Sequence, residues 1–372
     1  MDLLTAIPLL TALLFPWEQG EGFDWLPPAQ KPLVLTFTGD IMAHDVNYKM
    51  SDFSKIYESL APILLEDDLS FANLEAPVDP HKPYSSYPSF NVHPEYVQAA
   101  IQGGFEAFSL ANNHCNDQGL DSMKATLKFF KELPGTGPLY HGLKSDPSAA
   151  VPAMVREVNG IRVGLVSFTS LLNQARGKEW AEFYPYADFY SSQVDEAMVT
   201  SLESRIREEK KSCDILIVGF HDGLEYVNKP FPAQVSLYRK LVEAGADVVW
   251  AHHPHVVLPV EVWPSGNRQG IILYSLGNFI SGQAWRLGPG DKLSDRARTG
   301  DGVLVQVRVH RLKNGFFPVL GEIHHLNNYR HPLFGMITGL TRMWAETLDS
   351  PAWREFYQAR LKIQEKVIEN LP

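Results

Sequence analysis

The stretch Ala246–His255, ADVVWAHHPH, sets an apolar run directly before two histidines that lie one residue apart. The run Ala246–Trp250 is typical of a short buried strand. His253 and His255 would follow the carboxyl end of that strand, where an H-x-H pair can direct both rings into one crevice. Neutral imidazole is a common metal ligand, so the stretch indicates a metal site. Taken alone, it would equally fit a solvated loop with spare histidines.

Four other segments share this design, an apolar run followed by residue types that bind metals. They are Leu33–Thr38 followed by GDIMAH, Leu69–Ala72 followed by NLE, Ala107–Ala111 followed by NNH, and Asp214–Phe220 followed by HDG. Together with the first stretch, these clusters hold six of the thirteen histidines, all at predicted strand ends. In an open α/β sheet, ligands and metals bind at that edge. The repetition therefore predicts one shared metal centre.

The composition fits a soluble protein with one large domain or two ordinary ones. Of the 372 residues, 45% are hydrophobic, which is ample for a large core. The charged fraction of 20% is ordinary for a soluble protein. The formal charge of −10 leaves no basic stripe, so we expect no nucleic-acid polymer as partner. Cys115 and Cys213 give neither a disulfide framework nor a zinc-finger spacing. Cys115 directly follows His114, but adjacent side chains seldom face each other, so a buried thiol is favoured over a nucleophile.

Residues 1–30 form an apolar segment whose role stays open at this stage. Leu3–Trp17 is too short to cross a bilayer of ~30 Å as a helix, so we expect no transmembrane span. A signal peptide would need a basic start, and no Lys or Arg precedes Lys31. An unusual export signal and a packed N-terminal segment both remain open, as do a cytoplasmic and an exported or envelope-associated location.

Residues 31–335 alternate strand and helix patterns, which favours an α/β sandwich in one domain, followed by a helical tail over 336–372. The expected helices are Asp52–Asp67 with Pro62 inside it, Pro94–Gln102, Asp121–Leu133, Gln193–Lys210, Val235–Ala244 and the amphipathic Ala352–Leu371. The expected strands also include a hairpin, Ala153–Val158 and Ile161–Val166 around Asn-Gly, and Val256–Trp263, Gly270–Leu276 and Val303–His310. Ser281–Thr299 lacks periodicity, which predicts a surface loop that could cover a site.

The clusters supply seven candidate ligands and no thiolate: Asp40, His44, Glu75, Asn113, His221, His253 and His255. Carboxylate, imidazole and amide donors suit Mn, Fe, Zn or Mg better than a structural zinc site. The set exceeds the needs of one catalytic ion, so we expect two divalent ions about 3.5–4 Å apart that hold a phosphate-like group and activate water. A histidine outside the ligand set could protonate the leaving group. Asp222 and Glu225 are either partners that orient imidazoles or surface charges.

The ordered motifs GDIMAH, NLEAPV, ANNH, HDGLEY, AHHPHV and SLGNF, within residues 33–282, resemble the CapA/PgsA family of capsule-synthesis proteins. That family belongs to the calcineurin-like metallophosphoesterase superfamily, so the resemblance implies a four-layer α/β/β/α sandwich. It also implies involvement with poly-γ-glutamate, an anionic isopeptide polymer. By residue, it implies that Asp40 and His255 bind one metal, that Asn113, His221 and His253 bind the other, and that His114 is the general acid.

Two positions depart from the superfamily pattern. The D-x-H of the first motif is absent, and His44 lies four residues after Asp40 instead. Asn73-Leu74-Glu75 replaces the segment with the bridging aspartate, and we assign the bridge to Glu75. A longer carboxylate there would alter the metal spacing or the choice of metal.

Several further residues receive weaker assignments. His44, Asn73 and His252 are candidates for metal ligands or for supports of the ligands, and His252 would point away from the H-x-H pair on an extended backbone. Asn278, which follows a strand, and Arg286, in the long loop, are candidates for substrate contact. A turn asparagine and a solubilising arginine are the alternatives.

These observations lead us to expect a CapA-like metal-dependent hydrolase with phosphoesterase-type chemistry. Its substrate would be a phosphoester or an acidic capsule or cell-envelope polymer, and capsule-synthase subunits could be its protein partners. The alternatives are a non-catalytic accessory or export component of a poly-γ-glutamate synthase complex, or a nucleotide phosphodiesterase. The nearly complete ligand set favours the enzyme, because a purely structural descendant would not need it.

Overall fold

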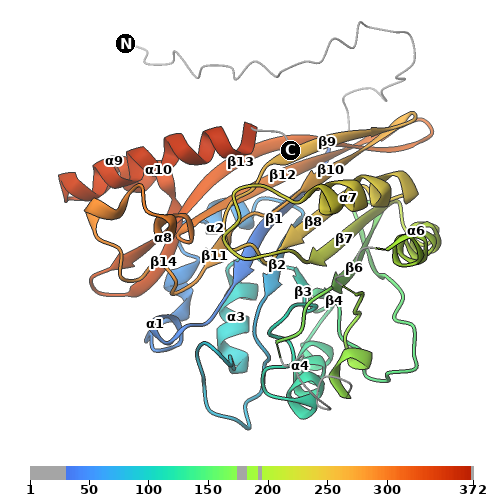
Figure 1. Ribbon diagram of the computed structural model, residues 1–372, viewed down its shortest axis with the longest axis horizontal. Coiled ribbons are helices and arrows are strands. Elements are labelled where there is room, and N and C mark those ends of the chain that lie inside the picture. The colour runs from blue at the N-terminus through green and yellow to red at the C-terminus, as the bar shows by residue number, and fades with distance from the viewer. Residues whose placement is uncertain (1–30, 174–181, 192–194, 370–372) are drawn as a thin grey trace, which may run out of the picture.

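The computed structural model describes residues 31–173, 182–191 and 195–369, and it contains two β-sheets packed face to face (Figure 1). The eight-stranded sheet runs in the order β14 (Gly335–Leu340), β13 (Gly315–His331), β12 (Asp301–Leu312), β1 (Leu33–Ile41), β2 (Leu69–Leu74), β3 (Ala107–Ser109) and β4 (Leu139–His141), with β11 (Asn278–Ile280) also paired to β1. The six-stranded sheet runs in the order β5 (Met154–Val158), β6 (Ile161–Thr169), β7 (Ile215–His221), β8 (Val248–His252), β10 (Arg268–Leu273) and β9 (Val260–Ser265).

Parallel strands form the centre of each sheet, and apolar side chains fill the space between the sheets. β1 to β4 pair in parallel in one sheet, and β6, β7, β8 and β10 do so in the other. Strands buried on both faces read as continuous apolar runs, which is why these segments were recognisable from the sequence. Phe37 and Phe71 stack with ring centroids 4.7 Å apart, and Trp250 of the other sheet packs on both.

Helices cover the outer faces of both sheets. On the first sheet, α3 (Pro94–Gln102) and α4 (Leu120–Glu132) bury residues such as Tyr96 and Phe130. On the second sheet, α6 (Glu196–Lys210) and α7 (Pro232–Ala244) bury residues such as Leu202 and Leu241. The expected four-layer α/β/β/α sandwich is therefore confirmed. The short helices are α1 (Asp45–Tyr48), η1 (Phe53–Ile56), α2 (Ala61–Leu64), η2 (Tyr184–Tyr186), η3 (Pro289–Asp291) and α8 (Asp295–Arg298).

The C-terminal helices α9 (Thr341–Thr347) and α10 (Pro351–Glu369) pack beside the β13–β14 hairpin. Arg360 of α10 is buried and donates from Nε to Asp301 Oδ1 at 3.1 Å, which fastens the helix to the start of β12. The predicted boundary at residue 335 falls at the first residue of β14, which is still part of the sheet. Among the helices of the described residues, none is both long enough and apolar enough to span a membrane.

Three secondary-structure expectations are wrong. The single helix expected over Asp52–Asp67 is split into η1 and α2, because Asp52 caps a first short turn and Pro62 cannot continue a helix from it. The strand expected from Val256 begins only at Val260, after a turn that contains two prolines. The loop expected over 281–299 contains the helical turns η3 and α8. The hairpin of β5 and β6, helix α3 and the C-terminal helix agree with expectation.

Candidate metal centre

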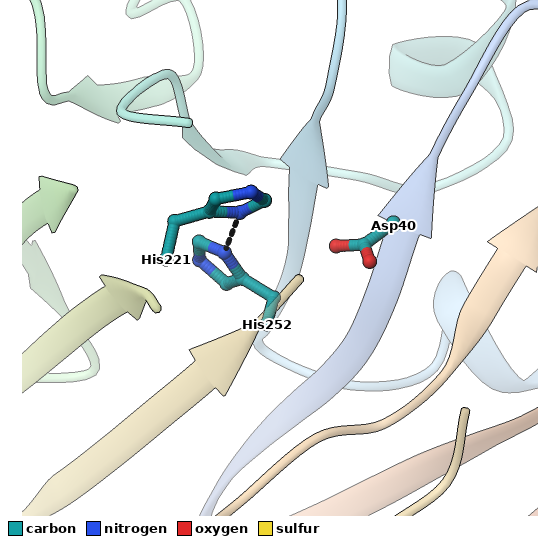
Figure 2. Close-up of side chains that lie close together, drawn as sticks. All are labelled: Asp40, His221 and His252. Atoms are coloured by element: carbon teal, nitrogen blue, oxygen red, sulfur yellow. Dashed lines mark hydrogen bonds between the residues drawn. The ribbon is translucent and has the colours of Figure 1, made fainter. Parts of the chain in front are cut away.

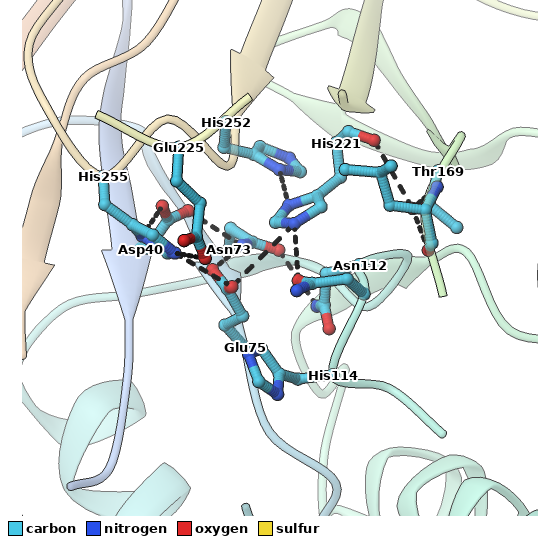
Figure 3. Close-up of polar contacts among 12 residues, drawn as sticks. Asp40, Asn73, Glu75, Asn112, His114, Thr169, His221, Glu225, His252 and His255 are labelled. Atoms are coloured by element: carbon cyan, nitrogen blue, oxygen red, sulfur yellow. Dashed lines mark hydrogen bonds and ion pairs between the residues drawn. The ribbon is translucent and has the colours of Figure 1, made fainter. Parts of the chain in front are cut away.

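The predicted ligand residues converge where the carboxyl ends of strands from both sheets meet (Figure 3). Asp40 lies near the end of β1 and pairs in register with Asn73 of β2, and Glu75 follows directly. His221 and His252 are the last residues of β7 and β8 and pair with each other. Parallel neighbours in register place their ends side by side, so chain segments more than 200 residues apart contribute to one cluster.

Several buried ligand atoms in this cluster have no hydrogen-bond partner. Apart from Asp40 Oδ2, which faces His255 Nδ1 at 3.1 Å, they are Glu75 Oε1, His252 Nε2, His253 Nδ1 and His255 Nε2. A buried polar atom without a partner costs about 1–3 kcal/mol, so four in one place require an explanation. Ligand atoms within 4.8 Å of one another form the sets Asp40–Glu75–His255, Glu75–His221–His253, Asp40–His221–His252 and Glu225–His253–His255. Their oxygen and nitrogen donors match the expected divalent ions, and a bound cation would satisfy these atoms.

His255 is held on one side so that its other ring nitrogen faces the centre. Its Nδ1 lies 3.1 Å from Asp40 Oδ2 and 3.1 Å from Asn278 Oδ1, which assigns the proton to Nδ1. Its Nε2 lies 3.6 Å from Glu75 Oε1. Metal-binding histidines usually donate their second N–H to such an oxygen. Burial alone would lower the pKa of His255, but the charge of Glu75 and the bond to Asp40 raise that pKa to about 9.

Two carboxylates share one amide at the base of the centre. Asn73 Nδ2 donates to Asp40 Oδ1 at 2.8 Å and to Glu75 Oε2 at 3.1 Å. Burial and the charge of Asp40 raise the pKa of Glu75 well above its usual range. For Asp40, burial opposes ionisation, but the bond and the charge of His255 outweigh it and hold the pKa below its usual value. Asn73 therefore supports both carboxylates through its nitrogen, and its oxygen accepts from Asn112 at 3.2 Å.

His221 joins the amide side of the centre to the second sheet. Its Nε2 lies 2.8 Å from Asn113 Oδ1, and its Nδ1 lies 2.8 Å from His252 Nδ1. Figure 2 shows the two rings in contact, with the Asp40 carboxylate directed toward them. Burial and the neighbouring histidines lower the pKa of His221 well below its usual value. A neutral imidazole is the form that binds a metal, so this environment prepares His221 for that role.

The end of β8 and the turn that follows it bring His252, His253 and His255 to the centre. His253 has φ 110° and His255 has φ 55°, a region that non-glycine residues enter rarely and at a cost of about 1–3 kcal/mol. The expectation that His252 points away assumed an extended backbone, and these angles show that the chain turns instead. Burial lowers the pKa of His252 to about 4 and that of His253 to about 3. His252 thus contacts His221 and keeps its own Nε2 unpartnered.

His114 stands beside the ligand set, and it is oriented by two residues that the sequence analysis missed. Its Nδ1 lies 2.6 Å from Asp117 Oδ2, and Asn173 Nδ2 lies 2.8 Å from the same nitrogen. Asn173 also accepts from Asn113 Nδ2 at 2.8 Å, so it connects the candidate acid to a candidate ligand. The three-residue spacing between His114 and Asp117 was a usable signal for the first contact. Asn173 lies about 60 residues away in an irregular segment and gave no signal.

His44, Asn278 and Asp222 occupy supporting positions. His44 Nδ1 accepts the Gly282 N–H at 3.0 Å, and His44 belongs to none of the ligand sets found among the described residues. Asn278 is fully buried, and its amide bonds to Thr299, Gln283 and His255, so it orients His255. Asp222 bonds to Ser170, Gln234 and Tyr238, which directs it away from the imidazoles.

The three arginines of the loop after β11 have different surroundings. Arg286 is exposed and stacks on Trp285, with its guanidinium carbon 4.6 Å from the ring centroid. Arg296 is also exposed. Arg298 instead donates to the carbonyl oxygens of Tyr226 and Val227 at 3.2 and 2.7 Å. Through these bonds it holds the loop between β7 and α7, which carries Glu225.

The chain matches the family described as "Bacterial capsule synthesis protein PGA_cap" over residues 34–283, a span that runs from β1 to just beyond β11 and includes every candidate ligand. It belongs to the PGA_cap family. The chain is 31% identical over 329 residues to the capsule biosynthesis protein CapA of Bacillus anthracis, covering 83% of this chain and 72% of the relative. It is also 31% identical to the PGA biosynthesis protein CapA of Bacillus subtilis, covering 84% of this chain and 78% of the relative. The expected relation to CapA is therefore confirmed.

A crystal structure of the calcineurin-like phosphoesterase YfkN from Bacillus subtilis superimposes with a TM-score of 0.44 and 13% sequence identity. The superposition covers 91% of this chain and 99% of that one.

Proposed function

We propose that this PGA_cap member is a metal-dependent hydrolase with phosphoesterase-type chemistry that acts in poly-γ-glutamate capsule synthesis. The observation that carries the proposal is the convergence of buried, unpartnered ligand atoms from Glu75, His253 and His255 beside an oriented histidine, His114. Capsule synthesis enters through the names of the Bacillus relatives. Capsule-synthase subunits would be its protein partners.

Two divalent ions would be held by these residues, and Glu75 belongs both to the set with Asp40 and His255 and to the set with His221 and His253. Asp40 and His255 would hold one ion, and Asn113, His221 and His253 would hold the other. Mn, Fe, Zn and Mg are all compatible with these donors. When bound, such ions polarise a phosphate-like group and lower the pKa of bound water. His252 contacts His221, and Asn73 positions the two carboxylates, so both support the ligands.

His114 is the residue that we assign to proton transfer. Asp117 accepts the Nδ1 proton, which leaves Nε2 as the nitrogen that can carry a second proton. In that doubly protonated form the ring is positively charged, and Asp117 would stabilise this charge. His114 would then donate the Nε2 proton to the leaving-group oxygen and become neutral. Asn173 fixes the position of both groups, because it contacts His114 and also bonds to Asp117 at 3.1 Å.

The test is metal content, measured by mass spectrometry on the untagged full chain, together with hydrolysis of bis-p-nitrophenyl phosphate with and without chelator. We expect close to two equivalents of Mn, Fe or Zn and turnover that the chelator removes. His255→Ala should lose metal, whereas Glu66→Gln, an exposed residue in another part of the chain, should keep it. A chain that takes up no metal under any loading condition would refute the proposal and favour an accessory role in capsule synthesis.

A further inference from the structure

Glu225 is a further carboxylate beside the candidate metal centre. Its Oε1 lies 3.9 Å from His255 Nε2, and its carboxylate falls within 4.8 Å of ligand atoms of both His253 and His255. Figure 3 shows the side chain reaching from its loop toward the cluster. His253 and His255 are the residues assigned above to different ions, so the carboxylate lies near both proposed metal positions.

The exposure of Glu225 sets it apart from the other members of the ligand sets. Its side chain is 41% exposed, whereas Asp40, Glu75 and the histidines of these sets are buried. A catalytic metal centre must keep a position open to substrate, and that position has to face solvent. The solvent-facing side of this centre is therefore the side on which Glu225 lies.

The backbone that carries Glu225 is fixed to the histidine turn itself. Tyr226 N donates to Pro254 O at 2.8 Å, and Pro254 lies between His253 and His255. Tyr226 has φ 62°, and Arg298 donates to the carbonyl oxygen of Tyr226. Gln283 Nε2 also bonds to the Tyr226 hydroxyl at 3.2 Å. The loop is thus anchored on the same turn as the ligands, and its exposed carboxylate is the part that side-chain rotation can move.

We propose that Glu225 is an exchangeable ligand of the metal centre, which binds there when substrate is absent and is displaced by the anionic group of the substrate. This inference rests on the proposed function, because it requires a metal to bind. A carboxylate at the substrate-facing side strengthens metal binding by its charge. For the same reason it competes with any phosphate-type anion that needs the same position. Removing the charge should therefore change the two affinities in opposite directions.

The experiment uses the full chain, stripped of metal, and compares wild type with Glu225→Gln and with the control Glu66→Gln. Calorimetric titration with Mn²⁺ should show binding weakened by about tenfold in Glu225→Gln, the scale typical of losing a group that supports a metal site. Titration of the Mn²⁺-loaded proteins with inorganic phosphate should show binding strengthened by roughly tenfold in Glu225→Gln, because a like charge has been removed. Glu225→Asp, which keeps the charge on a shorter side chain, should stay closer to wild type in phosphate affinity.

The possible outcomes are distinguishable. Unchanged Mn²⁺ and phosphate affinities in Glu225→Gln would overturn this inference, because they assign the residue to the loop alone. Weaker phosphate binding would also overturn it, since Glu225 would then assist the anion instead of competing with it. If wild type itself binds no Mn²⁺, the proposed function fails first, and the inference about Glu225 fails with it.

Discussion

Replacing Glu75 by Gln should stabilise the metal-free protein and weaken its response to metal. Glu75 and Asp40 both accept from Asn73 Nδ2, at 3.1 and 2.8 Å, so the two carboxylates lie within about 6 Å of each other. Two unit charges at about 6 Å repel by about 3 kcal/mol at an effective dielectric constant of about 20. His255 offsets part of that repulsion, so we expect the metal-free variant to gain about 1–2 kcal/mol in free energy of unfolding.

With metal present the sign should reverse. One ion at about 100 times its Kd stabilises the folded state by about 2.7 kcal/mol. If the lost carboxylate weakens binding about a hundredfold, most of that gain disappears. For a chain of 372 residues, the rise in melting temperature on adding metal should then be roughly 3 °C smaller than in wild type. Thermal unfolding of both proteins with EDTA and with MnCl₂ at pH 7 measures both effects. A variant that is less stable than wild type in EDTA, or that responds to Mn²⁺ as wild type does, would refute this account of the centre.

Three further changes test other parts of the molecule. His114→Ala should keep the metal content of wild type and lose about 10²–10⁴-fold in turnover; metal loss would instead make His114 a ligand. Arg360→Ala should lower the free energy of unfolding by about 3–5 kcal/mol in urea titration, because it leaves Asp301 buried and uncompensated, and a loss below about 1 kcal/mol would contradict this. Burial raises the pKa of Glu106 from 4.5 to about 7, so ionising this carboxyl group lowers the free energy of unfolding. This loss of stability is absent below pH 4.5 and complete above pH 7. Glu106→Gln should therefore raise the melting temperature at pH 8 and leave it unchanged at pH 4, and an equal effect at both pH values would exclude a charge effect.

The sequence predicted the fold well where both faces of a strand are buried. The strands that carry Asp40, His221 and His252 at or near their ends were recognisable because continuous apolar runs ended in clusters of polar ligand types. β13, the long strand Gly315–His331, was missed, because it is only partly buried and its pattern is neither continuous nor alternating. The helix expected over Asp52–Asp67 failed for a local reason, since a capped turn and Pro62 competed with a correct apolar spacing.

The candidate site was predictable as a set of residues but not in its connections. Strand ends in a parallel sheet meet at one edge, so the approach of Asp40 to Glu75 in one sheet, and of His221 to His252 in the other, followed from topology. The role of Asn73 as a shared donor, and the contact of Asn173 with His114, depend on distances between segments that no local pattern encodes. The direction of His252 depended on a positive φ at the next residue, which a histidine adopts only when the surrounding structure imposes it.

The geometry of the centre also depends on how the two sheets pack. Asp40 belongs to the first sheet and His252 to the second, so the distance between their ligand atoms is set by the space between the sheets. Trp250 Nε1 donates to Thr38 O at 2.8 Å, two residues before each of these ligands along its strand. This bond crosses the interior directly beside the centre, where the indole also packs on Phe37. The apolar core therefore does more than stabilise the fold, because it fixes the relative positions of ligands that the two sheets contribute separately.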